Sequence, residues 1–300
     1  MLIHTQKNNL SIPKELDWET ELIDVKEVCF GKKDMISSIP EGKHHFVVRK
    51  DTQEYISMVG SNYKPTEYKD ICEKQAQGLE KSGLLNKGNF TCRDYMFDGY
   101  GKFKRSVTFE DITIEPRVGD IVNFQQSGIS SHDGSIPNTT DATPNRLACL
   151  NGMFTPVFKV IENFRHTRRF DIEILTDIYK KSTEKFFEME PYFADMDKMR
   201  VSKFQIESAL KETICKRKAT EKKPRGYNEK LLELLMAQYL TEASKMGDTM
   251  WAFYNALTHW ATHPENFEYK ENAKLHNLER SNTDKVLVFM QSPQFKSFYN

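Results

Sequence analysis

Two histidines, His259 and His263, stand four residues apart in a segment whose pattern is typical of a helix. This spacing places both imidazoles on one helix face, as in the zinc-binding helix of a metalloprotease. Such an enzyme also needs a glutamate directly after the first histidine, as the general base for the metal-bound water. Trp260 stands there instead, and nothing in the sequence fixes His276 or Glu265 beside the pair. The sequence therefore favours packed or surface histidines over a metal site.

The run Ser131-His132-Asp133 contains the three residue types of a hydrolytic triad. Triads, however, are assembled across a fold rather than from neighbouring positions, and the G-x-S-x-G turn of the hydrolases is absent. Asp133-Gly134 is a strong turn signal, so we expect a structured turn, with a phosphate-binding nest of backbone N–H groups as the alternative. We expect no catalytic constellation and no cofactor.

The strongest chemical signal is a mixture of cations and aromatic side chains in the stretches 100–105 and 164–170. Proteins that bind single strands combine a positively charged groove with aromatic rings on which bases stack. A nucleic-acid-binding site is therefore predicted at Tyr100, Lys102, Phe103, Lys104, Arg105, Arg165, Arg168 and Arg169.

The first of these stretches has the pattern of a β-strand, in which alternate side chains share a face. Lys102 and Lys104 then point to one side, and Phe103 and Arg105 to the other. One face would belong to the core and the other to a groove. The alternative is a solvated edge strand whose lysines oppose aggregation. The hydrophilic segment 216–226, with six cations against one glutamate, favours binding.

Composition limits the class of protein. Three hundred residues with 12% aromatics provide enough apolar surface for one large globular domain or two ordinary ones. Acidic and basic residues number 43 each, so only a local patch can attract a polyanion. The five cysteines are odd in number and lack a C-x-x-C spacing, which indicates reduced thiols. Without an apolar leader or a run of 18 apolar residues, we expect a soluble, cytoplasmic protein that does not bind membranes.

The chain changes character near residue 171. Before it, we expect a hairpin at 46–60, a helix at 66–83, three short strands in 90–124, a long loop at 127–144 and a strand at 157–170. After it, helical spacing predicts helices at 171–190, 202–218, 228–245 and 249–263.

These elements predict an α+β fold, an antiparallel sheet with packed helices and a helical C-terminal extension. The expected parts are a lead-in over 1–45, an α+β core domain over 46–200 and a helical region over 201–300. The folding core is expected within 90–153, where Leu147 and Leu150 belong to an apolar run.

Three separated blocks together resemble a known family. They are SHDGS at 131–135, RLACLNGM at 146–153 and DTMWAFYNALTHW at 248–260. In order and spacing, over roughly residues 45–270, they resemble the phage/plasmid-like protein family, a domain of unknown function carried by bacteriophages, prophages and plasmids.

That resemblance implies single-strand binding or annealing in phage recombination or replication inside a bacterial host cell, because Rad52-type annealing proteins share the order of sheet and then helices. The implied partners are single-stranded DNA and further copies of the chain. A phage or plasmid protein that binds a host protein, for instance to inhibit a defence system, is the second hypothesis. A hydrolase that uses His259 and His263 is the third.

Overall fold

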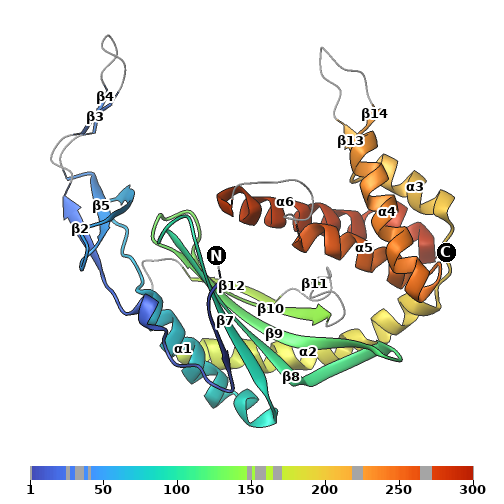
Figure 1. The fold of residues 1–300 in the computed structure, drawn as a ribbon, viewed down its shortest axis with the longest axis horizontal. Coiled ribbons are helices and arrows are strands. Elements are labelled where there is room, and N and C mark those ends of the chain that lie inside the picture. Colours follow the sequence, from blue (N-terminus) through green and yellow to red (C-terminus); the bar gives the residue numbers. More distant parts are fainter. Residues whose placement is uncertain are drawn as a thin grey trace. The chain divides into compact units, whose positions relative to one another are not determined.

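The computed structural model describes residues 2–24, 28–30, 37–39, 42–146, 151–152, 160–164, 171–217, 226–263 and 272–299. Strands dominate before residue 171 and helices after it, which confirms the predicted α+β fold with its helical C-terminal stretch (Figure 1). No helix in the described part of the chain is long and apolar enough to span a membrane.

The main sheet follows the order β1-β7-β8-β9-β10-β11, and β12 also pairs with β10. Its longest strands are the two arms of one hairpin, β8 and β9, joined at Gly119, which has a positive φ of 82°. The strands are β1 (Leu2–Lys7), β7 (Phe90–Phe97), β8 (Lys102–Arg117), β9 (Asp120–Ser131), β10 (Asn138–Arg146), β11 (Asn151–Gly152) and β12 (Val160–Phe164).

A smaller sheet has the order β2-β5-β6, and its strands are β2 (Thr20–Asp24), β5 (His44–Arg49) and β6 (Tyr55–Gly60). The β5–β6 pairing confirms the hairpin predicted at 46–60. Two short strands, β3 (Val28–Phe30) and β4 (Ser37–Ile39), pair with each other.

The helices are α1 (Tyr68–Lys81), α2 (Ile172–Lys198), α3 (Lys203–Glu212), α4 (Glu229–Met246), α5 (Met250–Thr262), α6 (Asn272–Gln291) and α7 (Pro293–Lys296), with 3-10 turns η1 (Lys14–Leu16), η2 (Leu84–Lys87) and η4 (Ser297–Tyr299). Local sequence sets several of their starts. Ser202 and Gln205 form a capping box on α3, and the Thr249 hydroxyl accepts a hydrogen bond from the Ala252 N–H of α5.

The expectation of a long loop at 127–144 is wrong, and the helix expected at 202–218 ends at Glu212. The stretch 127–144, rich in Ser, Thr, Asn and Pro, is mostly strand: β9 extends to Ser131 and β10 begins at Asn138. Alternate β10 residues are buried, and most of them are polar: Asn138, Thr140 and Arg146 hydrogen-bond to neighbouring segments of the fold. The segment 216–226 begins and ends as a hairpin stem, in which β13 (Lys216–Arg217) pairs with β14 (Gly226–Tyr227).

Helix α2 also exceeds its expected end at residue 190 and continues through Pro191 to Lys198. A proline inside a helix removes one backbone hydrogen bond. Burial of Met189, Phe193 and Met196 along the same helix offsets that cost, because these side chains continue the apolar stripe on both sides of the proline.

The chain divides into two compact units that interleave along the sequence. Unit 1 comprises residues 1–111, 125–142 and 160–182, and unit 2 comprises 112–124, 143–159 and 183–300. Strands β8, β9 and β10 and helix α2 each contribute residues to both units. The units therefore do not divide at 45/46 and 200/201, where the sequence placed its boundaries.

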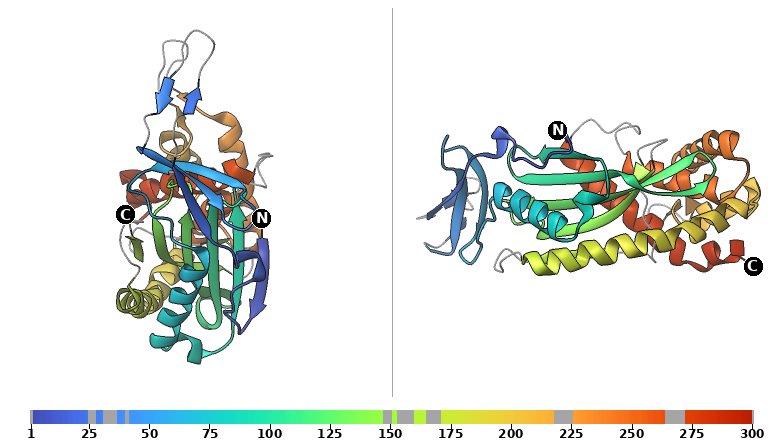
Figure 2. Two further views of the ribbon diagram at one scale, coloured as in Figure 1. Left: turned by 90° about the vertical axis from the view of Figure 1, so that its left-hand side faces the viewer. Right: turned by 90° about the horizontal axis from the view of Figure 1, so that it is seen from below.

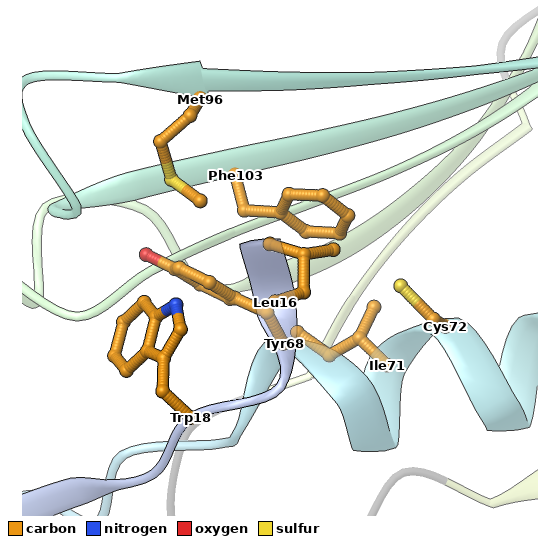
Figure 3. Close-up of a cluster of buried hydrophobic side chains, with 7 residues drawn as sticks. All are labelled: Leu16, Trp18, Tyr68, Ile71, Cys72, Met96 and Phe103. Carbon is orange, nitrogen blue, oxygen red and sulfur yellow. The ribbon is translucent and has the colours of Figure 1, made fainter. Parts of the chain in front are cut away.

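In unit 1, helices α1 and α2 lie on one face of the sheet (Figures 1 and 2). They approach closely at Gly78, where an added Cβ would lie 2.9 Å from the Tyr179 ring. Figure 3 shows the nearby core, in which Met96 and Phe103 of the strands face Tyr68 and Ile71 of α1. Burial of these large side chains provides most of the driving force for this packing.

In unit 2, helix α5 is buried along nearly its whole length, which explains its unusually apolar and aromatic sequence. Beside it, the buried Arg146 donates from Nε to Asp120 at 2.6 Å and from Nη1 to Glu242 at 3.1 Å. The indole N–H of Trp251 donates to the other Asp120 oxygen at 2.7 Å. This network connects β9, β10, α4 and α5.

Replacing Arg146 with methionine removes the cation and leaves two buried carboxylates without their charge partner. We expect Arg146→Met to lower the free energy of unfolding by about 3–5 kcal/mol. Urea denaturation of the purified protein measures this change. Lys198→Met is the matched control, because Lys198 makes an exposed pair with Asp195 and should change stability by less than about 1 kcal/mol. Equal losses of stability in the two variants would contradict the stabilising role assigned to the buried Arg146 network.

Candidate nucleic-acid interface

Strand β7 separates its side chains between the core and the opposite face of the sheet. Cys92, Asp94 and Met96 are buried, while the alternating Arg93, Tyr95 and Phe97 are only partly buried. The buried set faces α1, as Figure 3 shows for Met96, so the other set lies on the face away from α1. The rings of Tyr95 and Phe97 are nearly parallel, with centroids 6.3 Å apart and 9° between their planes.

Lys104 of β8 belongs to the same face. It is the cross-strand partner of Tyr95, and the next pair on this face joins Arg93 to Ser106. Two cations and two aromatic rings thus occur within adjacent strands on one side of the sheet. We call Arg93, Tyr95, Phe97 and Lys104 the outer sheet face.

The middle of the outer sheet face has polar, uncharged neighbours, and carboxylates lie near its two ends. Ser106 and Ser127 hydroxyls lie 3.2 Å apart, and the Thr108 hydroxyl donates to the Gln125 side chain at 3.0 Å. Glu110, six residues along β8 from Lys104, accepts a hydrogen bond from Thr91 and lies 3.9 Å from Lys7. At about 3.3 Å per residue, this carboxylate is roughly 20 Å from Lys104 along the strand.

The predicted alternation of side chains along β8 is confirmed, but the side chains on its inner face do not form a groove. Phe103 is 0% exposed and packs against Tyr68 with ring centroids 5.0 Å apart. A base cannot stack on this ring without unpacking the core of unit 1 (Figure 3). Phe103 is therefore a core residue, and its predicted role in binding is wrong.

Arg105 is also 0% exposed. Its guanidinium makes a two-point contact with Asp94, at 2.7 and 2.9 Å, and donates to the backbone carbonyls of Leu10 and Ser11. Burial disfavours its charge, yet the Asp94 carboxylate raises the pKa of Arg105 above its ordinary value. With its charge neutralised inside the fold, Arg105 cannot serve the phosphate-binding role predicted for it.

Lys102 has its ammonium between two carboxylates, 2.6 Å from Asp98 and 3.5 Å from Asp133. Burial disfavours the charged form, but the two carboxylates outweigh this and raise the pKa of Lys102. At 9% exposure the side chain closes the turn between β7 and β8 rather than presenting a cation to solvent, in contrast to its predicted role.

Tyr100 is partly buried, and an arginine of the protein itself covers its ring. The Arg49 guanidinium lies 4.3 Å from the Tyr100 centroid and 4.8 Å from that of Trp18, while Asp51 holds it in place at 2.6 and 3.0 Å. This is a cation–π arrangement within the chain. The predicted stacking role of Tyr100 would require Arg49 to leave first.

Of the eight predicted residues, the structure places Lys102 and Lys104 on the outer side of the sheet among those it describes, and Lys102, the cross-strand partner of Phe97, is held there by Asp98 and Asp133. Arg165, Arg168 and Arg169 lie outside the described residues, as do Leu147 and Leu150 of the expected folding core. Sequence reasoning missed Arg93, Tyr95 and Phe97. Their alternation with Cys92, Asp94 and Met96 was a period-2 signal that could have identified them.

The residues considered as catalytic candidates make contacts that stabilise the fold. His132 is fully buried, stacked on Tyr68 at 3.9 Å, and its Nε2 lies 3.0 Å from the Thr66 carbonyl. The Asp133 carboxylate accepts from the backbone N–H and hydroxyl of Ser135, which forms the turn expected from Asp133-Gly134.

On α5, the imidazoles of His259 and His263 stack with centroids 4.6 Å apart. Within the described residues, no group of three metal-ligating side chains occurs. Asn255, one turn before His259, is fully buried and donates to the Trp251 carbonyl at 2.8 Å, as expected for a structural amide.

The contrast between Arg105 and Lys104 gives a direct test of the two faces. Arg105→Met should lower the free energy of unfolding by about 3–5 kcal/mol, because Asp94 then stays buried without its cation. Lys104→Met, one residue away, should change it by less than about 1 kcal/mol. Both values come from chemical denaturation. A larger loss in Lys104→Met than in Arg105→Met would show that the faces are assigned the wrong way round.

No curated protein and no solved structure matches the chain. A family model does match, over residues 55–285, which include β6 to β14, α1 to α5 and most of α6. The chain therefore belongs to the family described as a domain of unknown function, DUF932.

Proposed function

We propose that this protein binds single-stranded DNA on its outer sheet face. The observation that carries the proposal is the grouping of Arg93 and Lys104 with Tyr95 and Phe97 on adjacent strands, with all four side chains partly buried. In such a site the cations contact phosphates and the two rings stack on bases. Hydroxyl and amide groups surround the middle of the face, while the carboxylates of Asp98 and Asp133 at one end and of Glu110 at the other limit where a strand can lie.

Strand annealing in phage recombination or replication is the activity that we propose for this binding. The antiparallel strands β7 to β10 precede the long helix α2, an order of elements also found in Rad52-type annealing proteins. Annealing by a ring or filament requires self-association, which analytical ultracentrifugation of the purified protein measures. Acceleration of duplex formation between complementary oligonucleotides tests the activity itself.

Tyr95→Ala should weaken binding of a single-stranded oligonucleotide by about 1–3 kcal/mol, the free energy of one stacked base. The salt dependence of binding should change little, because stacking releases no counterions. Fluorescence anisotropy at several salt concentrations measures both quantities. Tyr55→Ala, which removes an exposed ring on β6 outside the outer sheet face, is the matched control.

The double substitution Arg93→Ala and Lys104→Ala should, unlike Tyr95→Ala, reduce the salt dependence of binding. Each phosphate contact contributes about 0.7 to the slope of log affinity against log salt for single strands, so the slope should fall by about 1.4. The exposed Lys87 provides the control substitution, Lys87→Ala. If the wild-type protein fails to retard any oligonucleotide at low salt, the outer sheet face is not a DNA site.

A further inference from the structure

Unit 2 contains a groove that the proposed DNA site does not use. It lies between the end of α3, strand β13 and helix α6, and has a volume of about 650 Å³. Ile214 and Val288 provide its accessible apolar surface beside the buried Phe289, while Lys216, Lys285 and Asp284 provide charge. A volume of this size accommodates a few amino-acid side chains.

Helix α6 builds one wall of the groove. Ser281, Lys285 and Val288 are spaced by four and three residues, so they share one face of α6, whereas Val286 and Met290 point into the core. Val288 is an apolar side chain on this face and is 68% exposed. Together with Ile214 across the groove, Val288 offers apolar surface that a bound side chain would cover.

The charge next to this apolar surface is positive. Three cations, Lys216 and Lys285 on the groove and the exposed Arg217 beside it, outnumber two carboxylates, Asp284 on the groove and Glu212 beside it. We propose that this groove binds a short acidic segment of a partner protein, in which carboxylates flank an apolar side chain.

Two other occupants fit less well. Bases stack on accessible aromatic faces, but the accessible surface here is aliphatic and Phe289 is buried. A second copy of the chain that packs groove to groove across a two-fold axis would bring two positively charged surfaces together. An acidic peptide meets both requirements, because its apolar side chain covers Val288 and its carboxylates face the lysines.

Selection from an mRNA-displayed library of random dodecapeptides tests this proposal. The library is selected on the wild-type protein and counter-selected on Val288→Asp, which introduces a charge at an exposed position and should not unfold the protein. We expect enrichment of peptides with an apolar residue between acidic ones. Failure to enrich any peptide, or enrichment of sequences without acidic residues, would overturn the proposal.

One enriched peptide, labelled with fluorescein, is then measured by anisotropy. Val288→Asp and Lys285→Glu should each weaken its binding by about tenfold or more, which corresponds to about 1.4 kcal/mol. Phe204→Asp is the matched control, because Phe204 is 80% exposed on α3 and does not line the groove. Circular dichroism confirms that the variants are folded.

Three results would contradict the proposal: equal binding to wild type and Val288→Asp, displacement of the peptide by an oligonucleotide, or a change of oligomeric state in Val288→Asp. The second result would assign the groove to nucleic acid, and the third to a second copy of the chain. These outcomes are independent of the outer sheet face, which lies in unit 1.

Discussion

A buried arginine with a carboxylate partner is the constraint on which each compact unit depends. In unit 1, Arg105 connects β8 to Asp94 of β7 and to the backbone before η1. In unit 2, Arg146 connects β10 to Asp120 and Glu242. Removing such ions from water costs several kcal/mol each. Only a close, well-oriented ion pair with its remaining hydrogen bonds satisfied offsets this cost. These pairs therefore fix the positions of their strands, because a shift in register would leave a charge buried alone.

The same constraint explains why the cations of the sequence were a poor guide to a binding surface. Arg105 and Lys102 are paired with carboxylates, and Arg49 lies over two aromatic rings while Asp51 holds it. Sequence composition records that these charges exist but not where their partners lie. Asp94 and Asp98 are close in sequence to the basic cluster, yet only the β7–β8 register brings Asp94 beside Arg105.

The sequence did predict the features that depend on local periodicity. The helices α1, α4 and α5, the β5–β6 hairpin and the change from strands to helices near residue 171 all follow from apolar spacing and turn residues. The prediction failed where a strand consists mostly of polar residues, as in β10. The buried side chains of Asn138 and Thr140 form hydrogen bonds with residues of another segment, which the local sequence does not reveal. The outer sheet face was missed for a related reason: aromatic residues at alternate positions of β7 are typical of a core strand as well as of a stacking surface.

The small number of cations on the outer sheet face has a consequence for how the proposed DNA binding would operate. Two phosphate contacts give a salt slope of about 1.4, so affinity falls only about sevenfold between 50 and 200 mM salt. Binding of this kind is weak for a single copy, since charge contributes little and two stacked bases contribute a few kcal/mol. Several copies on one strand add their contacts at high effective concentration. With only two cations on this face, the proposed DNA binding would gain most of its strength from self-association, so the oligomeric state belongs to the proposal as much as the face itself.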